Sequence, residues 1–138
     1  MRRGAPKSTR SDSSATMLAQ MVVEQISSAH ANGATTRTVT DCAGNTFTIN
    51  AAGTSTGAGA GLTGATINFT AGQVANYSMN YVVCDAAGGR RTTYDVRWNV
   101  RTLASGPALV TVAARPLAAT NDLRRFAIPV SLRTIVGS

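Results

Sequence analysis

The sequence of 138 residues has few charged residues, few aromatic residues and only two cysteines. Charged side chains make up 14% and aromatic side chains 5% of the chain, whereas hydrophobic residues make up 43%. This balance favours one globular domain with a sizeable core over a disordered chain. No apolar run reaches membrane-spanning length, so the chain as written is expected to carry neither a signal peptide nor a membrane anchor.

The residues that carry most enzyme chemistry are also scarce. The acidic residues are Asp12, Glu24, Asp41, Asp85, Asp95 and Asp122. They form no carboxylate pair, no His/Cys/Asp cluster has metal-ligand spacing, and no serine lies in a nucleophile elbow. His30, the only histidine, is expected near a helix end, where an interaction with the helix dipole or with water is the simpler interpretation. We therefore predict no enzymatic activity, no catalytic residue, no metal site and no cofactor.

A glycine-rich segment from Ala51 to Gly64 matches the dinucleotide-binding pattern in letters only. Gly59, Gly61 and Gly64 have the required spacing. A dinucleotide site needs a strand before the glycines and a helix N-terminus after them, so that helix amides meet the pyrophosphate. Here residues 65–70, a strand pattern, follow the glycines. We therefore interpret the segment as a flexible surface loop.

Cys42 and Cys84 lie at the ends of predicted strands. Two cysteines without supporting histidines make a zinc site a poor explanation. The remaining alternatives are a disulfide and a pair of buried free thiols. We favour the disulfide, which would close a loop of about 40 residues and contribute about 4 kcal/mol in the chain-entropy model.

The net charge is +7, and Lys7 is the only lysine. Two interpretations compete: scattered surface arginines that keep the protein soluble, and a basic module that binds a polyanion such as DNA. We favour the first, because excess charge without a patch says little about function. Residues 1–12 are interpreted as a flexible basic arm or as the cut end of a longer chain. The candidate polyanion contacts are Arg90, Arg91, Arg124 and Arg125.

Residues 13–31 form the only convincing helical pattern, because apolar side chains recur there at helical spacing. Ser11, Asp12 or Ser13 is expected to cap its start, and Asn32-Gly33 to end it. The predicted packing face consists of Leu18, Met21, Val22, Ile26 and Ala29. One helix in front of many strands must lay this face on a sheet, since neither buries its apolar surface alone.

The rest of the chain is typical of strands and turns. Residues 37–41 and 46–50 flank a Gly/Asn turn and predict a hairpin, and residues 77–84 predict a further strand. Three consecutive strands follow. They cover residues 91–103, 109–115 and 126–136.

These three strands predict an antiparallel meander with one dry and one solvated face. The predicted sheet core consists of Tyr94, Val96, Trp98, Val100, Phe126, Ile128, Val130 and Leu132. The polar residues that alternate with the first four, Asp95, Arg97, Asn99 and Arg101, are expected to face solvent, with ion pairs of small net value. The expected fold is α+β: a single domain, residues 13–138, with an N-terminal amphipathic helix packed on an antiparallel sheet.

This order of elements resembles the soluble part of type IV pilin-like proteins, closest to minor pilins of the PilV kind and to type II secretion pseudopilins. The resemblance lies in the helix at residues 17–26 (MLAQMVVEQI), followed by a glycine-rich region and three strand sequences. These strands read YDVRWNV at 94–100, LVTVAARP at 109–116 and RFAIPVSL at 125–132. It spans most of the chain in architecture, although its motifs are loose.

The resemblance implies a pilin-like roll and a structural role in filament assembly, priming or capping. Its partners would be other pilin or pseudopilin subunits, with partner choice in the loops Ala51–Gly64 and Leu117–Arg125. The helix would be the C-terminal half of the pilin spine, whose hydrophobic half is absent from this sequence. Contact with the membrane would be only through that half. The implied location is the cell envelope, in the periplasm or a surface filament, with inner-membrane anchoring before assembly.

Overall fold

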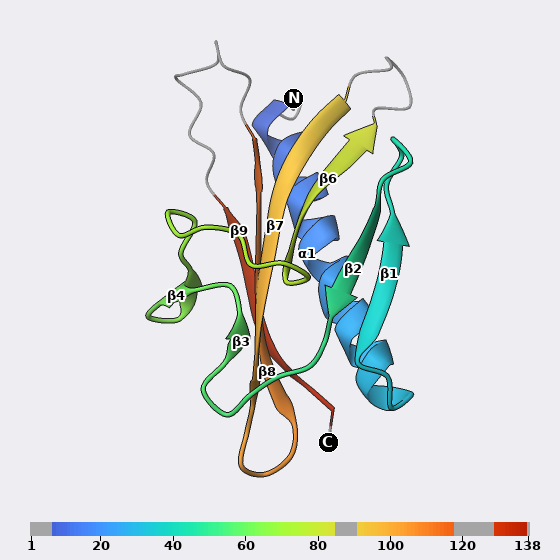
Figure 1. The fold of residues 1–138 in the computed structure, drawn as a ribbon. Coiled ribbons are helices and arrows are strands. Elements are labelled where there is room, and N and C mark those ends of the chain that lie inside the picture. The colour runs from blue at the N-terminus through green and yellow to red at the C-terminus, as the bar shows by residue number, and fades with distance from the viewer. Residues whose placement is uncertain (1–6, 85–90, 118–128, 138) are drawn as a thin grey trace, which may run out of the picture.

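The computed structural model describes residues 7–84, 91–117 and 129–137. These residues form an α+β domain in which one long helix lies against antiparallel sheets (Figure 1). The helix is α1 (Lys7–Ala31). The strands are β1 (Thr36–Thr40), β2 (Thr46–Asn50), β3 (Ala58–Gly59), β4 (Leu62–Thr63), β5 (Thr66–Ile67), β6 (Ser78–Cys84), β7 (Arg91–Thr102), β8 (Ala108–Pro116) and β9 (Val130–Val136).

The helix begins earlier than the sequence pattern predicts. It starts at Lys7, so the capping residues expected at positions 11–13 lie inside it, and residues 7–12 are helical rather than part of an arm. No proline or glycine interrupts this stretch, and a helix continues through polar residues until a breaker stops it. The C-terminal end agrees with the expectation. Gly33 has a φ of 70°, and the Ala34 N–H donates to the Ala29 carbonyl at 2.8 Å, a Schellman-type ending.

One stripe of α1 is buried against the sheet. Of the predicted packing residues, Leu18, Val22, Ile26 and Ala29 are buried, and Met21 is partly buried beside them. Ala15 and Ala19 complete the stripe with 1% and 0% exposure. Their small side chains let the helix backbone approach the strands closely, which explains why the buried face is wider than the large apolar residues alone suggest.

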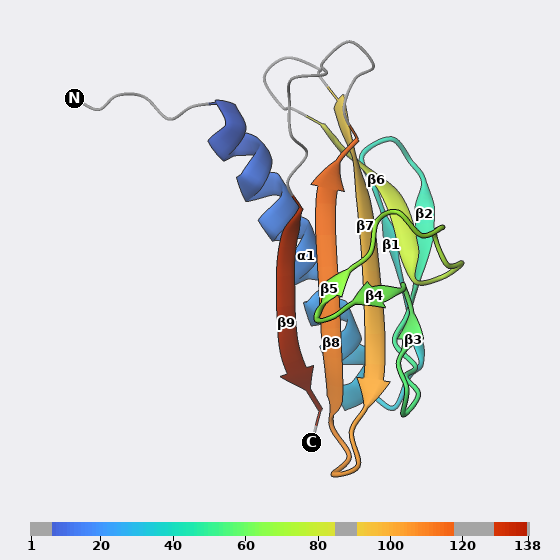
Figure 2. The same cartoon turned by 90° about the vertical axis from the view of Figure 1, so that its left-hand side faces the viewer.

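The strands β7, β8 and β9 form the expected antiparallel meander. The main sheet has the order β3-β7-β8-β9, and β6 also pairs with β7 (Figure 2). Tyr94, Val96, Trp98 and Val100 face α1 and are at most 2% exposed. The indole N–H of Trp98 donates to the Asn50 carbonyl at 3.0 Å, which satisfies the one polar atom of this side chain.

Of the remaining predicted core residues, Val130 and Leu132 on β9 are partly buried and pack against this cluster. Phe126 and Ile128 lie outside the described residues.

The other face of the meander is covered, which corrects the expectation of a solvated face. Asp95, Arg97 and Asn99 are only 3%, 6% and 7% exposed, whereas Arg101 is exposed. Residues 53–77 run across this face and contribute β3, which pairs with β7, and the β4–β5 hairpin (Figure 2). We call residues 53–77 the cover. The segment interpreted as a flexible loop, Ala51–Gly64, is therefore held in part against the sheet, through β3 and the buried Ala60. Polar residues alternate on a strand in the same way whether water or paired polar groups meet them.

The β1–β2 hairpin lies beside α1 and is joined to the main sheet by a disulfide. Cys42 and Cys84 are bonded, with their Cα atoms 6.1 Å apart. Cys42 belongs to the hairpin turn and Cys84 ends β6, so the bond joins two segments that are 42 residues apart in the sequence.

We expect the double variant Cys42→Ala/Cys84→Ala to lower the free energy of unfolding by about 4 kcal/mol, because the unfolded chain regains the entropy of an open loop. Urea denaturation of the two proteins measures the difference. Wild-type protein treated with reductant should show the same loss. An unchanged urea midpoint in both samples would contradict the prediction.

Candidate functional surfaces

A buried ion cluster lies between the meander and its cover. The Asp95 carboxylate accepts two hydrogen bonds from Arg97, from Nε to Oδ1 and from Nη2 to Oδ2, each at 3.0 Å. Arg115 Nη2 lies 3.6 Å from the second oxygen, and Gln73 Nε2 donates to the first at 3.1 Å. One carboxylate thus holds two guanidinium groups and fastens residue 73 of the cover.

Phe69 extends this cluster through its aromatic ring. The guanidinium carbons of Arg97 and Arg115 lie 5.0 and 4.5 Å from the ring centroid, within the range of cation–π attraction. Arg97 also donates to the Ala71 carbonyl at 2.7 Å. The sequence pattern showed Arg97 as an alternating polar residue but did not identify Phe69 as its partner, because the two residues are far apart in the chain.

The contacts of the cluster indicate a structural role. Asp95 is ion-paired, hydrogen-bonded and 3% exposed, so it is shielded from any external group. The cluster therefore holds the cover against the sheet.

A second polar centre surrounds Asp41 in the hairpin turn. Its carboxylate accepts backbone hydrogen bonds from Ala43 at 3.0 Å and Asn45 at 2.8 Å. It also accepts from the Asn45 side chain and from the Val82 N–H on β6, at 3.1 and 3.0 Å. Desolvation by burial raises the pKa of Asp41, but the bonds from Asn45, Val82 and Ala43 outweigh it and hold the pKa below 3.8. Asp41 thus joins the hairpin to β6 beside the disulfide.

His30 has a structural partner at the end of α1. Its Nε2 lies 3.0 Å from the Ala51 carbonyl oxygen, so Nε2 carries the proton and donates to that oxygen. The bond joins the last turn of the helix to the segment that follows β2. Neither of the roles considered from the sequence, dipole compensation or contact with water, anticipated this partner.

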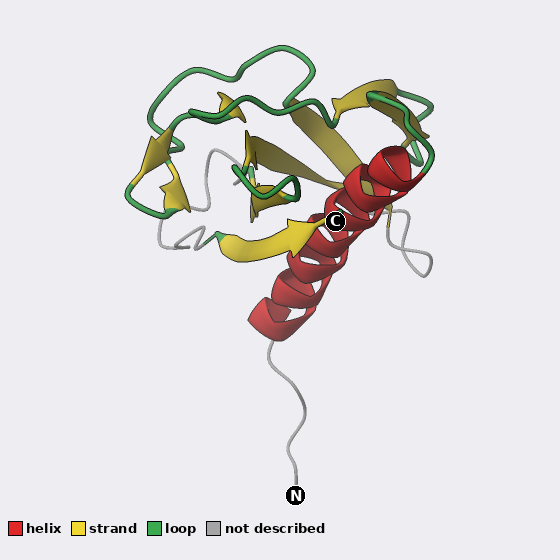
Figure 3. Cartoon of the chain, turned by 90° about the horizontal axis from the view of Figure 1, so that it is seen from below, coloured by secondary structure: helices red, strands yellow, loops and turns green. Residues whose placement is uncertain are grey.

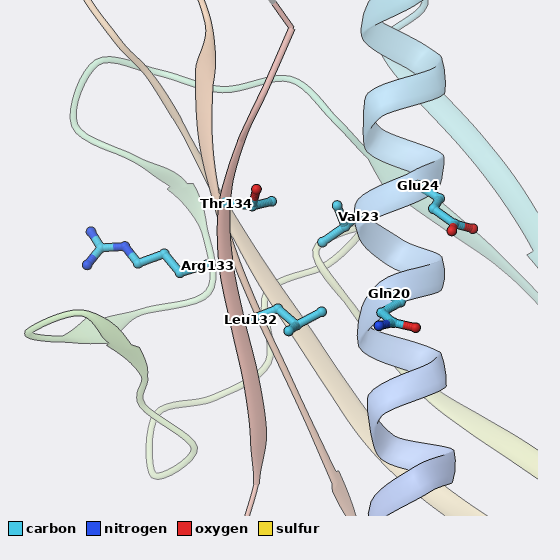
Figure 4. A pocket seen from close by; sticks show the side chains of 6 residues that line it. All are labelled: Gln20, Val23, Glu24, Leu132, Arg133 and Thr134. Carbon is cyan, nitrogen blue, oxygen red and sulfur yellow. The ribbon is translucent and has the colours of Figure 1, made fainter.

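The remaining surface features are shallow. A groove of about 410 Å³ lies between α1 and β9 and is lined by Gln20, Val23, Glu24, Leu132, Arg133 and Thr134. Figure 4 shows that Leu132 and Thr134 point from β9 towards the helix, whereas Arg133 points away. A smaller hollow of about 260 Å³ lies beside His30. On α1, Met17 is 53% exposed.

Among the arginines with described side chains, some have partners within the domain and others face solvent, and Arg101 does both. Arg97 and Arg115 belong to the ion cluster, Arg37 donates to Gln25 at 3.2 Å, and Arg101 donates to the Ser55 carbonyl at 3.3 Å. Of the candidate polyanion contacts, Arg91 is exposed at the start of β7. The other three, Arg90, Arg124 and Arg125, lie outside the described residues.

The glycines of the dinucleotide-like match lie among strands and turns. Gly59 is in β3, Gly61 lies just before β4, and Gly64 is in the β4–β5 turn. Among the described residues, no group of three or more His, Cys, Asp or Glu is arranged to hold a metal ion. In the same part of the chain, no helix has the length and apolar character needed to cross a membrane.

Comparison with known proteins adds no family assignment. No protein-family model matches the chain, and no curated protein or solved structure is significantly similar to it.

We expect Asp95→Ala to lower the free energy of unfolding by about 3–5 kcal/mol, because Arg97 would remain buried without its counter-ion. Chemical denaturation measures the loss. The matched control is Asn80→Ala, which removes an exposed partner of the same Gln73 amide and should cost less than about 1 kcal/mol. Equal losses in the two variants would contradict the role assigned to the cluster.

The stability contributed by Asp41 should depend on pH. Its folded pKa is below 3.8, the value expected for the unfolded chain, so the contribution is complete above that value and is lost as the pH falls through the folded pKa. The Asp41→Asn variant should therefore lose less stability than the wild type between about pH 4 and pH 2. Thermal melts across this range test it, with the exposed Glu24→Gln as control. Parallel curves for wild type and Asp41→Asn would refute the assignment.

Proposed function

We propose that this chain is a structural subunit of a type IV pilus or of a type II secretion pseudopilus. It acts in the assembly, priming or capping of the filament, within the cell envelope. Its partners are other pilin or pseudopilin subunits. The function is assembly without turnover, so the important features are surfaces and rigidity rather than a reactive pocket.

The geometry of α1 is the observation that carries this proposal. The helix has 25 residues, which corresponds to a length of about 37 Å. Among the described side chains of α1, the buried stripe runs from Ala15 to Ala29, a span of about 21 Å. The N-terminal turns diverge from the sheet (Figures 2 and 3). A helix that is buried at one end and projects at the other is suited to act as a spine between subunits.

The disulfide supports a location in the cell envelope. Disulfides persist in oxidising compartments and are rare in the reducing cytosol. The Cys42–Cys84 bond joins the hairpin to the main sheet, so the rigidity of the domain depends on such a compartment. A domain held together by a disulfide, with a helix that projects from it, is suited to a subunit of a filament that must withstand force.

The alternative function, a polyanion-binding surface, has less support. Four arginines with described side chains have partners inside the domain: Arg37, Arg97, Arg101 and Arg115. Arg91 and Arg133 are exposed but lie on different strands that are not neighbours in the sheet. Among the described side chains, the positive charge is therefore dispersed rather than gathered into one patch.

We expect the chain to be recovered in filaments sheared from the surface of cells of the organism that encodes it. Deletion of the gene should reduce the number of filaments or the secretion that depends on them, and the wild-type gene should restore it. Immunogold electron microscopy and mass spectrometry of the sheared fraction provide the readout.

A variant pair tests the role of the helix. Met17→Asp places a charge on the exposed face of α1, and Leu62→Asp places one on β4, where Leu62 is 37% exposed. Both proteins should melt near the wild-type temperature, because neither side chain is buried. Met17→Asp should fail to restore filaments, whereas Leu62→Asp should succeed. Recovery of the chain only in the cytosol, with filaments unchanged by deletion, would overturn the proposal.

A further inference from the structure

The outer edge of β9 carries backbone groups that no described strand pairs. In the β7–β8 turn, the Leu103 N–H donates to the Pro107 carbonyl. Because backbone hydrogen bonds alternate along an antiparallel pair, the odd-numbered residues of β8 form them with β7 and the even-numbered residues form them with β9. The β8–β9 register then directs the N–H and C=O groups of Ser131, Arg133 and Ile135 away from the sheet. Ile135 is also the most exposed of the large hydrophobic residues with described side chains, at 58%.

The outer edge of β1 has the same character on the other side of the domain. The backbone N–H of Asp41 donates to the Asn45 carbonyl, and that of Ala51 donates to the Thr35 carbonyl. Odd-numbered residues of β1 therefore form the backbone hydrogen bonds with β2. Even-numbered residues therefore direct their backbone groups outward. They are Thr36, Thr38 and Thr40, all exposed, and only the Thr40 carbonyl has a described contact, with the Tyr81 hydroxyl at 3.4 Å.

The two edges are matched in length and direction. Each presents three outward residues, spaced two apart. β1 lies at the right of the domain in Figure 1, whereas β9 is the outermost strand of the main sheet at the left of Figure 2. In the view of Figure 1, β1 runs upward, and β9 runs downward in the same vertical frame (Figure 2). Two copies related by a rotation about this vertical axis would bring these edges together as antiparallel strands.

We propose that the edge of β9 pairs with the edge of β1 of a second copy of this chain, which adds a strand to the sheet. The register that aligns all outward residues places Thr36 opposite Ile135, Thr38 opposite Arg133 and Thr40 opposite Ser131. Antiparallel edges then exchange backbone bonds at each of these three pairs. The proposal rests on the proposed function in one respect: it takes the common orientation of the copies from a filament.

The side chains favour this partner over a second β9. In the pairing with β1, the β-branched Thr36 covers the exposed Ile135, and no like charges lie opposite each other. In the full-length pairing of β9 with itself, Arg133 would lie opposite its own copy, which is unfavourable. A two-fold pairing would also reverse the direction of α1 between copies. The β1–β9 contact joins different edges, so it continues from copy to copy instead of closing at two.

The register predicts a specific cross-link. Residues in a hydrogen-bonded antiparallel pair have Cα atoms about 5.5 Å apart, within reach of a disulfide. The purified double variant Thr38→Cys/Arg133→Cys, oxidised at high concentration, should give a ladder of dimers, trimers and larger species on a non-reducing gel. Peptide mapping should find positions 38 and 133 joined. The matched control, Thr38→Cys/Thr70→Cys, keeps one edge cysteine and moves the other to an exposed residue on the cover.

Two results would overturn the pairing. One is a yield of ladder no greater than that of the control. The other is an equal yield of dimer from Arg133→Cys alone, which would show that like edges meet. The same variants in sheared filaments separate this inference from the proposed function. Filaments that contain the chain without the link reject only the pairing, whereas a ladder in purified protein from a chain absent from filaments rejects only the proposed function.

Discussion

Strand β7 is buried on both faces, and the rest of the domain depends on how this is achieved. Its alternate side chains meet two different environments, with Val96 and Trp98 against α1 and Asp95 and Arg97 beneath the cover. An apolar face is stable against a helix without further conditions, whereas charged groups are stable out of water only when they are paired. The cover and the ion pair therefore depend on each other. The cover excludes water from Asp95 and Arg97, and their pairing offsets the free-energy cost of burying the two charges.

The sequence was sufficient for the features that depend on local periodicity, namely the helical stripe, the hairpin, the meander and the position of the cysteines. The covered face was not predictable in the same way, because Asp95 and Arg97 alternate on the strand as solvent-facing residues do. A signal was nevertheless present. A Cβ at Gly57 would lie 2.8 Å from the Asn99 side chain, and one at Gly59 would lie 2.6 Å from the Trp98 carbonyl. These glycines mark places where the cover approaches β7 closely, rather than places of flexibility.

The sequence also does not show which arginines are buried. A count of arginines assigns each of them to the surface, but Arg97 and Arg115 share one carboxylate and one aromatic ring. Their partners, Asp95 on β7 and Phe69 in the cover, come together only through the fold. The start of α1 at Lys7 has a different cause, since helical structure continues through polar residues that carry no periodic signal. The partners of the two arginines depend on contacts between distant parts of the chain, and the start of the helix depends on weak local preferences. Neither can be inferred from the periodicity of the sequence.

The described contacts cover some strand edges of the domain and leave others exposed. At the outer edge of β6, Asp41 accepts a hydrogen bond from the Val82 N–H, and the Cys42–Cys84 bond holds the β1–β2 hairpin in place. The hairpin therefore covers the outer edge of β6. Nothing comparable among the described residues covers the outer edge of β9. Natural proteins usually blunt such an edge with charge, proline or a bulge, but β9 has one arginine and regular pairing along its length. An edge left in this state is better explained by a partner strand than by solvent, and the assembly that we propose would supply one.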